Sequence, residues 1–341
     1  MKRFLILSTL LFLFVGCHWA CQKTFSLSPS GTTQTAPTPT PSINNNTLGW
    51  VLSTSSASFT PRSDQTSLVY NNAMWIIGGV NTTVPTYFND VWSSTNGSTW
   101  AQATATAAFS ARYAHSSLVY NNAMWVIGGY DGTTTLKDVW KSTDGINWTL
   151  VTNSAAFADR GYHSTMVYNG KMWVIGGFIL GSGGALSDAW YSTDGLTWTQ
   201  ATSTAAFGPR YIHSNLVYNG KMWLIGGFNT LSSSLLNDTW YSTDGITWSQ
   251  ATVAGAFSSR GSHTSLVFNN TMWVIGGLTS TAGGDINDSW FSTDGINWSQ
   301  SSGTPFTPVR GAHSSVVFNN SMWVIAGINN PTNLNDVWHS P

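Results

Sequence analysis

The sequence predicts an all-β fold, a six-bladed β-propeller of four-stranded antiparallel blades. One pattern of residues recurs six times after residue 47, with a period of 50 residues and one copy of 48. β-Branched and aromatic residues are abundant in each copy, whereas Glu is absent from the chain and Lys is rare. A period of this length with several short strands per copy is typical of propeller blades, which pack face to face around an axis.

The second copy illustrates the four strands that we expect in each blade. Strand A covers residues 115–120, and the Asn-Asn pair after it suits a two-residue type I′ hairpin, which needs positive φ. Strand B covers 124–127, an apolar run that we expect to end at the following Gly-Gly pair. Strand C covers 138–142, and an Asp-Gly turn leads into strand D around Trp148. Both faces of these strands are apolar or small, so neighbouring blades must cover both.

Four landmarks fix the register of the copies. The anchor arginines are Arg62, Arg112, Arg160, Arg210, Arg260 and Arg310. A Gly-Gly pair, or Ala-Gly in the last copy, begins 16 residues after each arginine. An Asp-x-Trp motif follows, with its aspartate at Asp90, Asp138, Asp188, Asp238, Asp288 and Asp336. A further tryptophan comes eight residues after the motif, at Trp100, Trp148, Trp198, Trp248 and Trp298.

The two ends of the repeat predict how the ring closes. The sixth copy stops at Pro341, before its strand D. Trp50 lies 12 residues before Arg62, and Trp100 precedes Arg112 by the same 12 residues. The segment at Trp50 is therefore the missing strand D. We expect it to pair with residues 336–339 and to remove the free sheet edges of an open ring.

With its Gly-Gly doublet, downstream Trp and period, the chain resembles the kelch repeat of six-bladed propellers over residues 48–341. This class includes the central domain of galactose oxidase, whose copper ligands have no recognisable counterpart set here. The segment Ser-Thr-Asp-Gly-Ile-Thr-Trp is also similar to the Asp-box turn of sialidases, with one residue fewer between Asp and Trp. We interpret it as a hairpin staple and not as a sugar site.

The N-terminus resembles that of a bacterial lipoprotein. Two basic residues precede an apolar run over residues 4–15, which is the length of an export signal and too short to span a bilayer. Phe14-Val15-Gly16-Cys17 is similar to a lipobox, with Phe14 where Leu is usual, so we expect a signal peptide at 1–16 and a lipid on Cys17. The alternative is an ordinary secreted protein. Residues 17–47 predict a Pro/Thr/Ser/Asn tether before the propeller at 48–341.

These features predict an exported chain, lipid-anchored in the bacterial cell envelope. His18 after the modified cysteine fits sorting to the outer membrane of a Gram-negative host. Only 8% of residues are charged and the net charge is -1, which gives no electrostatic footprint for nucleic acid or for an anionic membrane surface. The predicted propeller contains no Cys, so it has neither disulfides nor thiolate metal sites. We expect a monomer.

Residues that recur in every blade favour structural roles. Eighteen of the 19 tryptophans fall into three sets of six, and identical positions in every blade cannot all face one ligand, so packing is favoured over a carbohydrate platform. A histidine follows the anchor arginine by three residues in five copies and Gln65 takes its place in the first, which favours hydrogen bonding over a metal site. We expect each arginine to join its blade to the next through backbone carbonyls or an aspartate.

The acidic residues limit the enzyme classes. The chain has no Glu. It therefore lacks the carboxylate that sialidase chemistry uses, and a resemblance to sialic-acid mutarotases is weakened as far as those enzymes rely on Glu. Ten of the 14 aspartates belong to the Asp-x-Trp motifs or the Asp-Gly turns. Four lie outside the pattern: Asp64, Asp131, Asp159 and Asp285. A two-carboxylate hydrolase would need its acid and base among them. No cofactor or metal is expected.

The connections between strands B and C, which share one face with the D–A connections, differ most between copies. We place them at residues 80–89, 130–137, 178–187, 228–237, 278–287 and 328–335. Variation on a constant scaffold favours a binding surface. The candidate binding residues are Tyr87, Tyr113, Tyr130, Asp131, Phe178, Tyr211, Phe228 and Asp285.

Three functions remain open from the sequence. The first is a membrane-anchored module that binds a protein or glycan through this face. The second is a carbohydrate-active lyase or isomerase, for example one like a sialic-acid mutarotase, with its site at the channel mouth, that uses Tyr130, Asp131 and one or more of the arginines. The third is a structural surface-layer component, which predicts no ligand that depends on the loops.

Overall fold

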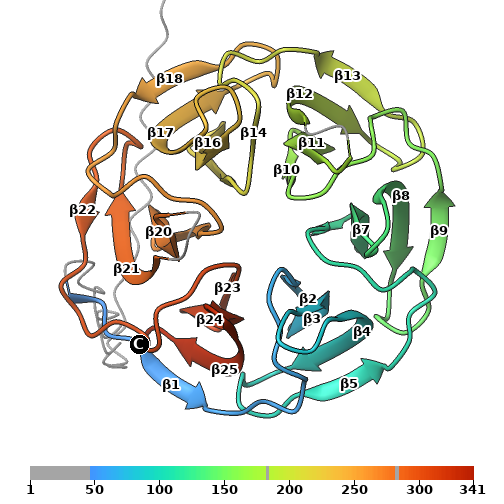
Figure 1. The fold of residues 1–341 in the computed structure, drawn as a ribbon, viewed down its shortest axis with the longest axis vertical. Coiled ribbons are helices and arrows are strands. Elements are labelled where there is room, and N and C mark those ends of the chain that lie inside the picture. Colours follow the sequence, from blue (N-terminus) through green and yellow to red (C-terminus); the bar gives the residue numbers. More distant parts are fainter. Residues whose placement is uncertain (1–46, 182–183, 281–283) are drawn as a thin grey trace, which may run out of the picture. The chain divides into compact units, whose positions relative to one another are not determined.

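The computed structural model describes residues 47–181, 184–280 and 284–341. Six sheets surround a central channel, as Figure 1 shows in a view along the channel axis. In each sheet the strands follow the order A-B-C-D from the channel outward. The predicted six-bladed, all-β architecture is therefore confirmed. Cys17 and the predicted signal peptide lie outside the described residues, and so does the tether up to residue 46.

The strands have the following bounds. The A strands are β2 (Thr66–Tyr70), β6 (Ser116–Tyr120), β10 (Ser164–Tyr168), β15 (Ser214–Tyr218), β19 (Thr264–Phe268) and β23 (Ser314–Phe318). The B strands are β3 (Ala73–Asn81), β7 (Ala123–Tyr130), β11 (Lys171–Ile179), β16 (Lys221–Asn229), β20 (Thr271–Leu278) and β24 (Ser321–Asn329).

The outer strands complete each blade. The C strands are β4 (Thr86–Ser94), β8 (Thr135–Ser142), β12 (Gly184–Ser192), β17 (Ser234–Ser242), β21 (Asp285–Ser292) and β25 (Thr332–His339). The D strands are β5 (Ala101–Thr104), β9 (Thr149–Thr152), β13 (Thr199–Thr202), β18 (Ser249–Thr252), β22 (Ser299–Gln300) and β1 (Val51–Thr54). The two-residue β14 (Arg210–Tyr211) pairs with β16.

The ring closes as predicted. Strand β1 pairs antiparallel with β25, with Val51 opposite His339 and Leu52 opposite Trp338. The last blade therefore has the order β23-β24-β25-β1, and its outer strand comes from the other end of the repeat (Figure 1).

The sequence predicted that strand B ends at the Gly-Gly pair, and this prediction is wrong. The pair bends the strand instead. Strand β7 runs on to Tyr130, with a bulge in its pairing to β8 between Ile127 and Gly129. Gly129 has φ 105°, and a Cβ there would lie 2.7 Å from the Cβ of His115. The chain needs glycine here because the connection before strand A crosses this point. The B–C turns are consequently shorter than predicted.

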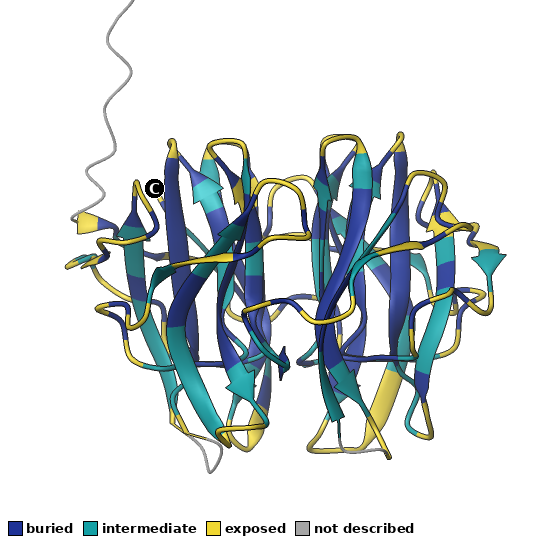
Figure 2. Cartoon of the chain, turned by 90° about the horizontal axis from the view of Figure 1, so that it is seen from above, coloured by how far each residue is buried: buried dark blue, intermediate teal, exposed yellow. Residues whose placement is uncertain are grey.

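Six apolar clusters fill the interfaces between neighbouring blades. The cluster between the first two blades contains Trp75 from β3 and Met124 from β7, together with Trp148 from the edge of β9. The tryptophans of strand B and those preceding strand D are buried. Those of strand C are only partly buried, and each donates its indole N–H to the aspartate two residues before it, as Trp140 does to Asp138 at 2.7 Å. Figure 2 shows buried strands inside and exposed turns at both faces.

The Asp-Gly turn between strands C and D is a hairpin staple, as predicted. Asp144 Oδ1 accepts the backbone N–H groups of Ile146 and Asn147 at 2.8 Å. Gly145 has φ 74°, and a Cβ on it would lie 2.2 Å from the Trp75 ring of the preceding blade. The turn therefore serves the packing between blades.

The two faces of the propeller carry different connections. We call the face that carries the B–C and D–A connections the mouth face. The type I′ turns between strands A and B, with positive φ at Asn121 and Asn122, lie on the opposite face, as do the C–D turns. Both ends of the described chain lie towards that opposite face, since Val51 pairs with His339 and Ser340 bonds to Met322 at the start of β24. No helix in the described ranges has the length and apolar character to cross a membrane.

Candidate functional site

Each D–A connection enters the channel at the residue two positions after the anchor arginine. These six residues have positive φ, between 49° and 56°. The backbone N–H of each donates to the carbonyl of its counterpart in the preceding blade at 2.8–3.2 Å, and the last bond, from Asp64 to Ala312, closes a ring. We call this ring the annulus. It consists of Asp64, Ala114, Tyr162, Ile212, Ser262 and Ala312.

A second ring, of histidine and glutamine side chains, lies beside the annulus. The Nε2 atom of each histidine bonds to the first hydroxyl of strand A in the preceding blade, as His163 does to Ser116 at 2.7 Å. Gln65 takes the same position and donates to Ser314 at 3.2 Å and to the carbonyl of Ile325 at 3.0 Å. The predicted hydrogen-bonding role of this set is therefore confirmed.

The imidazoles of this ring are neutral. Burial, with a smaller effect of the neighbouring arginines, lowers the pKa of His115, His213 and His313 to about 3. The pKa values of His163 and His263 lie well below the ordinary value for the same reasons. Among the described residues, no group of three or more His, Cys, Asp or Glu side chains could hold a metal ion.

The two rings line a cavity of about 170 Å³ at the level where the D–A connections enter the channel. We call it the mouth cavity. Asp64 and Tyr162 of the annulus line it, together with the glutamine and the five histidines of the second ring. The Nδ1 atoms of those histidines and Oε1 of Gln65 are buried and find no hydrogen-bond partner in the described part of the protein. These six atoms have almost no accessible surface, so they lie behind the cavity wall.

Asp64 is the carboxylate of the mouth cavity. The recorded hydrogen bond to its carboxyl group comes from Ser63 Oγ at 3.3 Å. The six ion pairs of the described residues all join an arginine to an Asp-x-Trp aspartate, so none involves Asp64. Burial raises the pKa of Asp64 to about 7. Burial, followed by the charge of Asp64, raises the pKa of Tyr113 to about 12 and that of Tyr162 well above its usual value.

Aromatic rings surround half of the mouth. Tyr113 stacks on Tyr87 at a centroid distance of 5.5 Å and an angle of 7°, and it meets Tyr130 edge-on at 5.3 Å. Tyr162 lies 6.1 Å from Tyr113 and 6.1 Å from Tyr211, so it joins two groups of rings. We call the joined set the aromatic crescent. It consists of Tyr87, Tyr113, Tyr130, Tyr162, Phe178, Tyr211 and Phe228.

The other half of the mouth carries small or aliphatic residues. Strand B and the D–A connection meet in one bridge per blade, and in the second and fourth blades both partners are aromatic, as with Tyr113 and Tyr130. The corresponding pairs in the fifth, sixth and first blades are Gly261 with Leu278, Gly311 with Ile328 and Ser63 with Val80. The mouth is therefore asymmetric, although the scaffold repeats six times.

Six of the eight residues that the sequence singled out thus meet in the aromatic crescent. Asp131 lies next to Tyr130, but its carboxylate accepts the backbone N–H groups of Thr133 and Thr134 at 2.9 and 2.8 Å and so closes the B–C turn. Asp285 lies in the fifth blade and accepts the N–H of Asn330 at 2.9 Å. It belongs to the aliphatic half of the mouth. Tyr162, which also belongs to the aromatic crescent, was not among the residues that the sequence predicted.

The anchor arginines are committed to the scaffold. Arg160 is fully buried, and its guanidinium donates to both carboxylate oxygens of Asp188 at 2.7 and 2.8 Å and to the carbonyl of Gly176 at 2.9 Å. These partners belong to its own blade, so the prediction that the side chain joins neighbouring blades is wrong. Its backbone makes that link, because its N–H bonds to Leu136 and its carbonyl to Gly129.

Charge is distributed unequally between the faces. The mouth face carries Asp64, Asp131, Asp159 and Asp285 with Lys137. The opposite face carries Asp144, Asp194, Asp244 and Asp294 with Lys141, Lys171 and Lys221. Within the described ranges the mouth face is therefore the more acidic.

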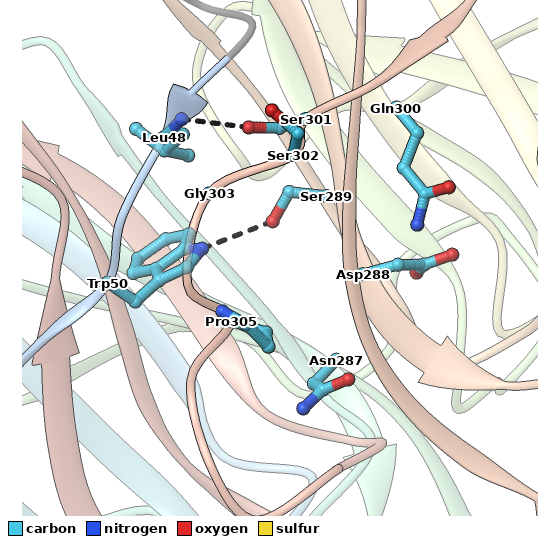
Figure 3. Close-up of a pocket in the computed structure, with 10 residues that line it drawn as sticks. All are labelled: Leu48, Trp50, Asn287, Asp288, Ser289, Gln300, Ser301, Ser302, Gly303 and Pro305. Carbon is cyan, nitrogen blue, oxygen red and sulfur yellow. Dashed lines mark hydrogen bonds between the residues drawn. The ribbon is translucent and has the colours of Figure 1, made fainter.

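A second hollow, of about 370 Å³, lies at the outer edge between the N-terminal segment and the fifth blade (Figure 3). Trp50 donates its indole N–H to Ser289 at 3.2 Å, and the N–H of Leu48 bonds to Ser301 at 2.9 Å. The Asp288 carboxylate in its wall is paired with Arg260. This hollow lies at the seam of the ring. The hydrogen bonds of Trp50 and Leu48 in its wall hold the N-terminal segment against the fifth blade.

Fold and mouth together define a closed propeller with a constant scaffold and one variable face, the general form of a kelch protein. The family model described as the KLHDC2/KLHL20/DRC7 Kelch-repeats domain matches residues 40–206 and 181–340, and the chain belongs to this Kelch-repeat family. A comparison with curated proteins found no match. Because kelch propellers commonly bind protein partners, membership indicates a protein-interaction module.

Proposed function

We propose that the chain binds a protein partner at the mouth face, with the aromatic crescent as the contact surface. One observation carries this proposal: seven aromatic rings that break the sixfold repeat gather on one side of one face. The repeated aromatic residues are held in the packing between blades. Tyrosine and phenylalanine are enriched at protein interfaces, where they supply contact area at a low entropic cost.

The crescent favours a protein over a glycan. Its rings cover one another, as Tyr113 does by stacking on Tyr87 and meeting Tyr130 edge-on, instead of standing apart as flat platforms. Beside it lie small residues such as Gly261 and Gly311, which leave room for a chain segment to cross the mouth. A glycan ligand is kept as an outcome of the experiment below.

The arginines and the aspartate required by the carbohydrate-active alternative are occupied. The anchor arginines are buried in ion pairs, and the carboxylate of Asp131 is bonded to its own turn. These groups would have to leave their partners before they could reach a substrate. The binding module therefore remains the function that the site supports best.

We also propose that this module is exported and anchored by a lipid on Cys17. The support comes from the basic residues, the apolar run and the lipobox-like segment at residues 1–17. Residue 47, where the described chain begins, leads into β1 at the face opposite the mouth. Metabolic labelling with a fatty-acid analogue should mark the full chain and leave Cys17→Ser unlabelled; labelling of the variant would contradict the anchor.

Partner capture with matched variants tests the binding function. The full chain carries either Tyr113→Ser with Tyr211→Ser at the mouth, or Ile146→Ser with Ile246→Ser in the exposed C–D turns of the same two blades. We expect the mouth variant to lose a protein that the wild type and the turn variant both retain, with all three melting alike. Capture that survives the mouth change, or a glycan recovered in place of a protein, would overturn the proposal.

A further inference from the structure

The mouth cavity is lined by a carboxylate without a cation. Its wall holds the Asp64 carboxylate, the Tyr162 ring and the ring of neutral imidazoles with Gln65. The Nδ1 atoms of five histidines and Oε1 of the glutamine find no donor among the described residues, but they have almost no accessible surface, so Asp64 is the acceptor that a ligand can reach. No lysine or arginine side chain lines the cavity. A negatively charged acceptor without an ion-pair partner favours a ligand that brings N–H groups and a positive charge.

The Nε2 atom of each imidazole already makes a hydrogen bond, and the partners of Nε2 determine whether Nδ1 carries a proton. His115 Nε2 lies 3.0 Å from the hydroxyl of Thr66, and the carbonyl of Ile77 also accepts a hydrogen bond from this ring. The proton therefore stays on Nε2, and Nδ1 presents a lone pair. A backbone carbonyl also accepts a hydrogen bond from the rings of His213 and His263, and all five imidazoles are neutral, so they add no positive charge to the cavity wall.

A cation satisfies the carboxylate and the rings together. Asp64 lacks an ion-pair partner, and its charge acts on Tyr113 and Tyr162. An ammonium group beside aromatic faces and a carboxylate gains from both. The excess of aspartate over lysine on the mouth face attracts the same charge.

Size selects the kind of cation. The cavity of about 170 Å³ is similar to engineered cavities of about 150 Å³ that accept benzene, so it admits one side chain and excludes a folded domain. A cavity of this size with a single carboxylate suits the compact ammonium of lysine better than the larger planar fork of arginine.

We infer that the mouth cavity binds the side-chain ammonium of a lysine presented by the protein partner, with Asp64 as its counter-ion and Tyr113 and Tyr162 beside it. This inference rests on the proposed function and names the feature of the partner that the site recognises. The aromatic crescent would contact the segment around the lysine.

Peptide titration tests the inference without the partner. The probes are acetyl-Gly-Lys-Gly-amide and the same peptide with norleucine or arginine, titrated into the full chain by calorimetry at pH 7. Asp64 has φ 52°, a conformation that asparagine also accepts, so Asp64→Asn preserves the backbone. Asp131→Asn is the matched control on the same face.

We expect the lysine peptide to bind at least tenfold more tightly than the norleucine and arginine peptides, and Asp64→Asn to remove that preference while Asp131→Asn keeps it. Binding should also release part of a proton from Asp64, whose neighbours are neutral imidazoles and the Tyr113 and Tyr162 hydroxyls; buffers of different ionisation enthalpy detect this. The inference would be overturned if the three peptides bound with equal affinity, if none of them bound, or if Asp64→Asn kept the preference for the lysine peptide. Partner capture would still decide the proposed function separately.

Discussion

Removing one charge from a buried ion pair should unfold the ring far more readily than the same change in an exposed turn. Asp188→Asn places a carboxamide against the Arg160 guanidinium, which is fully buried. The carboxylate now accepts N–H groups of Arg160 at 2.7 and 2.8 Å and the indole N–H of Trp190 at 2.7 Å. A carboxamide has one acceptor oxygen, so a donor must face a donor in either orientation.

The expected loss of unfolding free energy is about 3–5 kcal/mol, the cost of leaving a buried charge without its partner. The Asp144→Asn control should cost less than about 1 kcal/mol, because the turn is exposed and a carboxamide keeps the bonds to the backbone. The first blade shows this, since Asn96 there accepts the N–H groups of Ser98 and Thr99 at 3.0 and 2.9 Å.

Urea unfolding followed by tryptophan fluorescence measures both variants, since the tryptophans lie in the blade interfaces. The two changes are chemically identical, so the difference between them isolates the effect of the buried pair. If the unfolding free energy of Asp188→Asn lay within about 1 kcal/mol of the wild-type value, the stability of the fold would not depend on the pairing of the buried guanidinium with its carboxylate, and the reasoning would be refuted.

Three further predictions concern the scaffold. Gly145→Ala should destabilise the fold by more than about 1 kcal/mol, because its Cβ would lie 2.2 Å from the Trp75 ring and φ there is 74°; unchanged urea unfolding would refute this. Trp50→Ala should cost about 3–5 kcal/mol and promote association through the opened seam, measurable by unfolding and light scattering; a stable monomer would contradict the role of the seam. Acid should weaken the fold as the pH falls from 6.5 towards about 3, since unfolded histidines take up protons that the folded ring excludes. His115→Gln, which copies Gln65, should reduce that pH slope of the unfolding free energy by about 1.4 kcal/mol per pH unit, and an unchanged slope would mean that the folded His115 is charged.

The scaffold could be predicted because each signal is repeated. Six copies of one pattern separate turns from strands, and the equal spacing of Trp50 and Trp100 to their arginines identified the strand that closes the ring. The end of strand B was predicted wrongly. The doublet at Gly128 and Gly129 has the composition of a strand terminator, whereas it is a bulge that admits the backbone near His115.

The site could be predicted only in part, for a related reason. Aromatic residues in the variable connections identified most of the aromatic crescent. Tyr162 was missed because it stands two residues after its arginine, whereas Tyr113 and Tyr211 stand one after theirs. The annulus was not predicted, because positive φ falls on residues as different as Ile212 and Ser262, and nothing in those residue types indicates it.

Hydrogen–deuterium exchange on the complex with the captured partner tests the central claim most directly, namely that the residues which break the repeat at the mouth are the binding site. Protection on binding is predicted in the connections that carry Tyr113, Tyr162 and Tyr211, with exchange unchanged in the C–D turns at Asp144 and Asp244. Protection confined to those turns, with the mouth exchanging as in the free protein, would contradict the account.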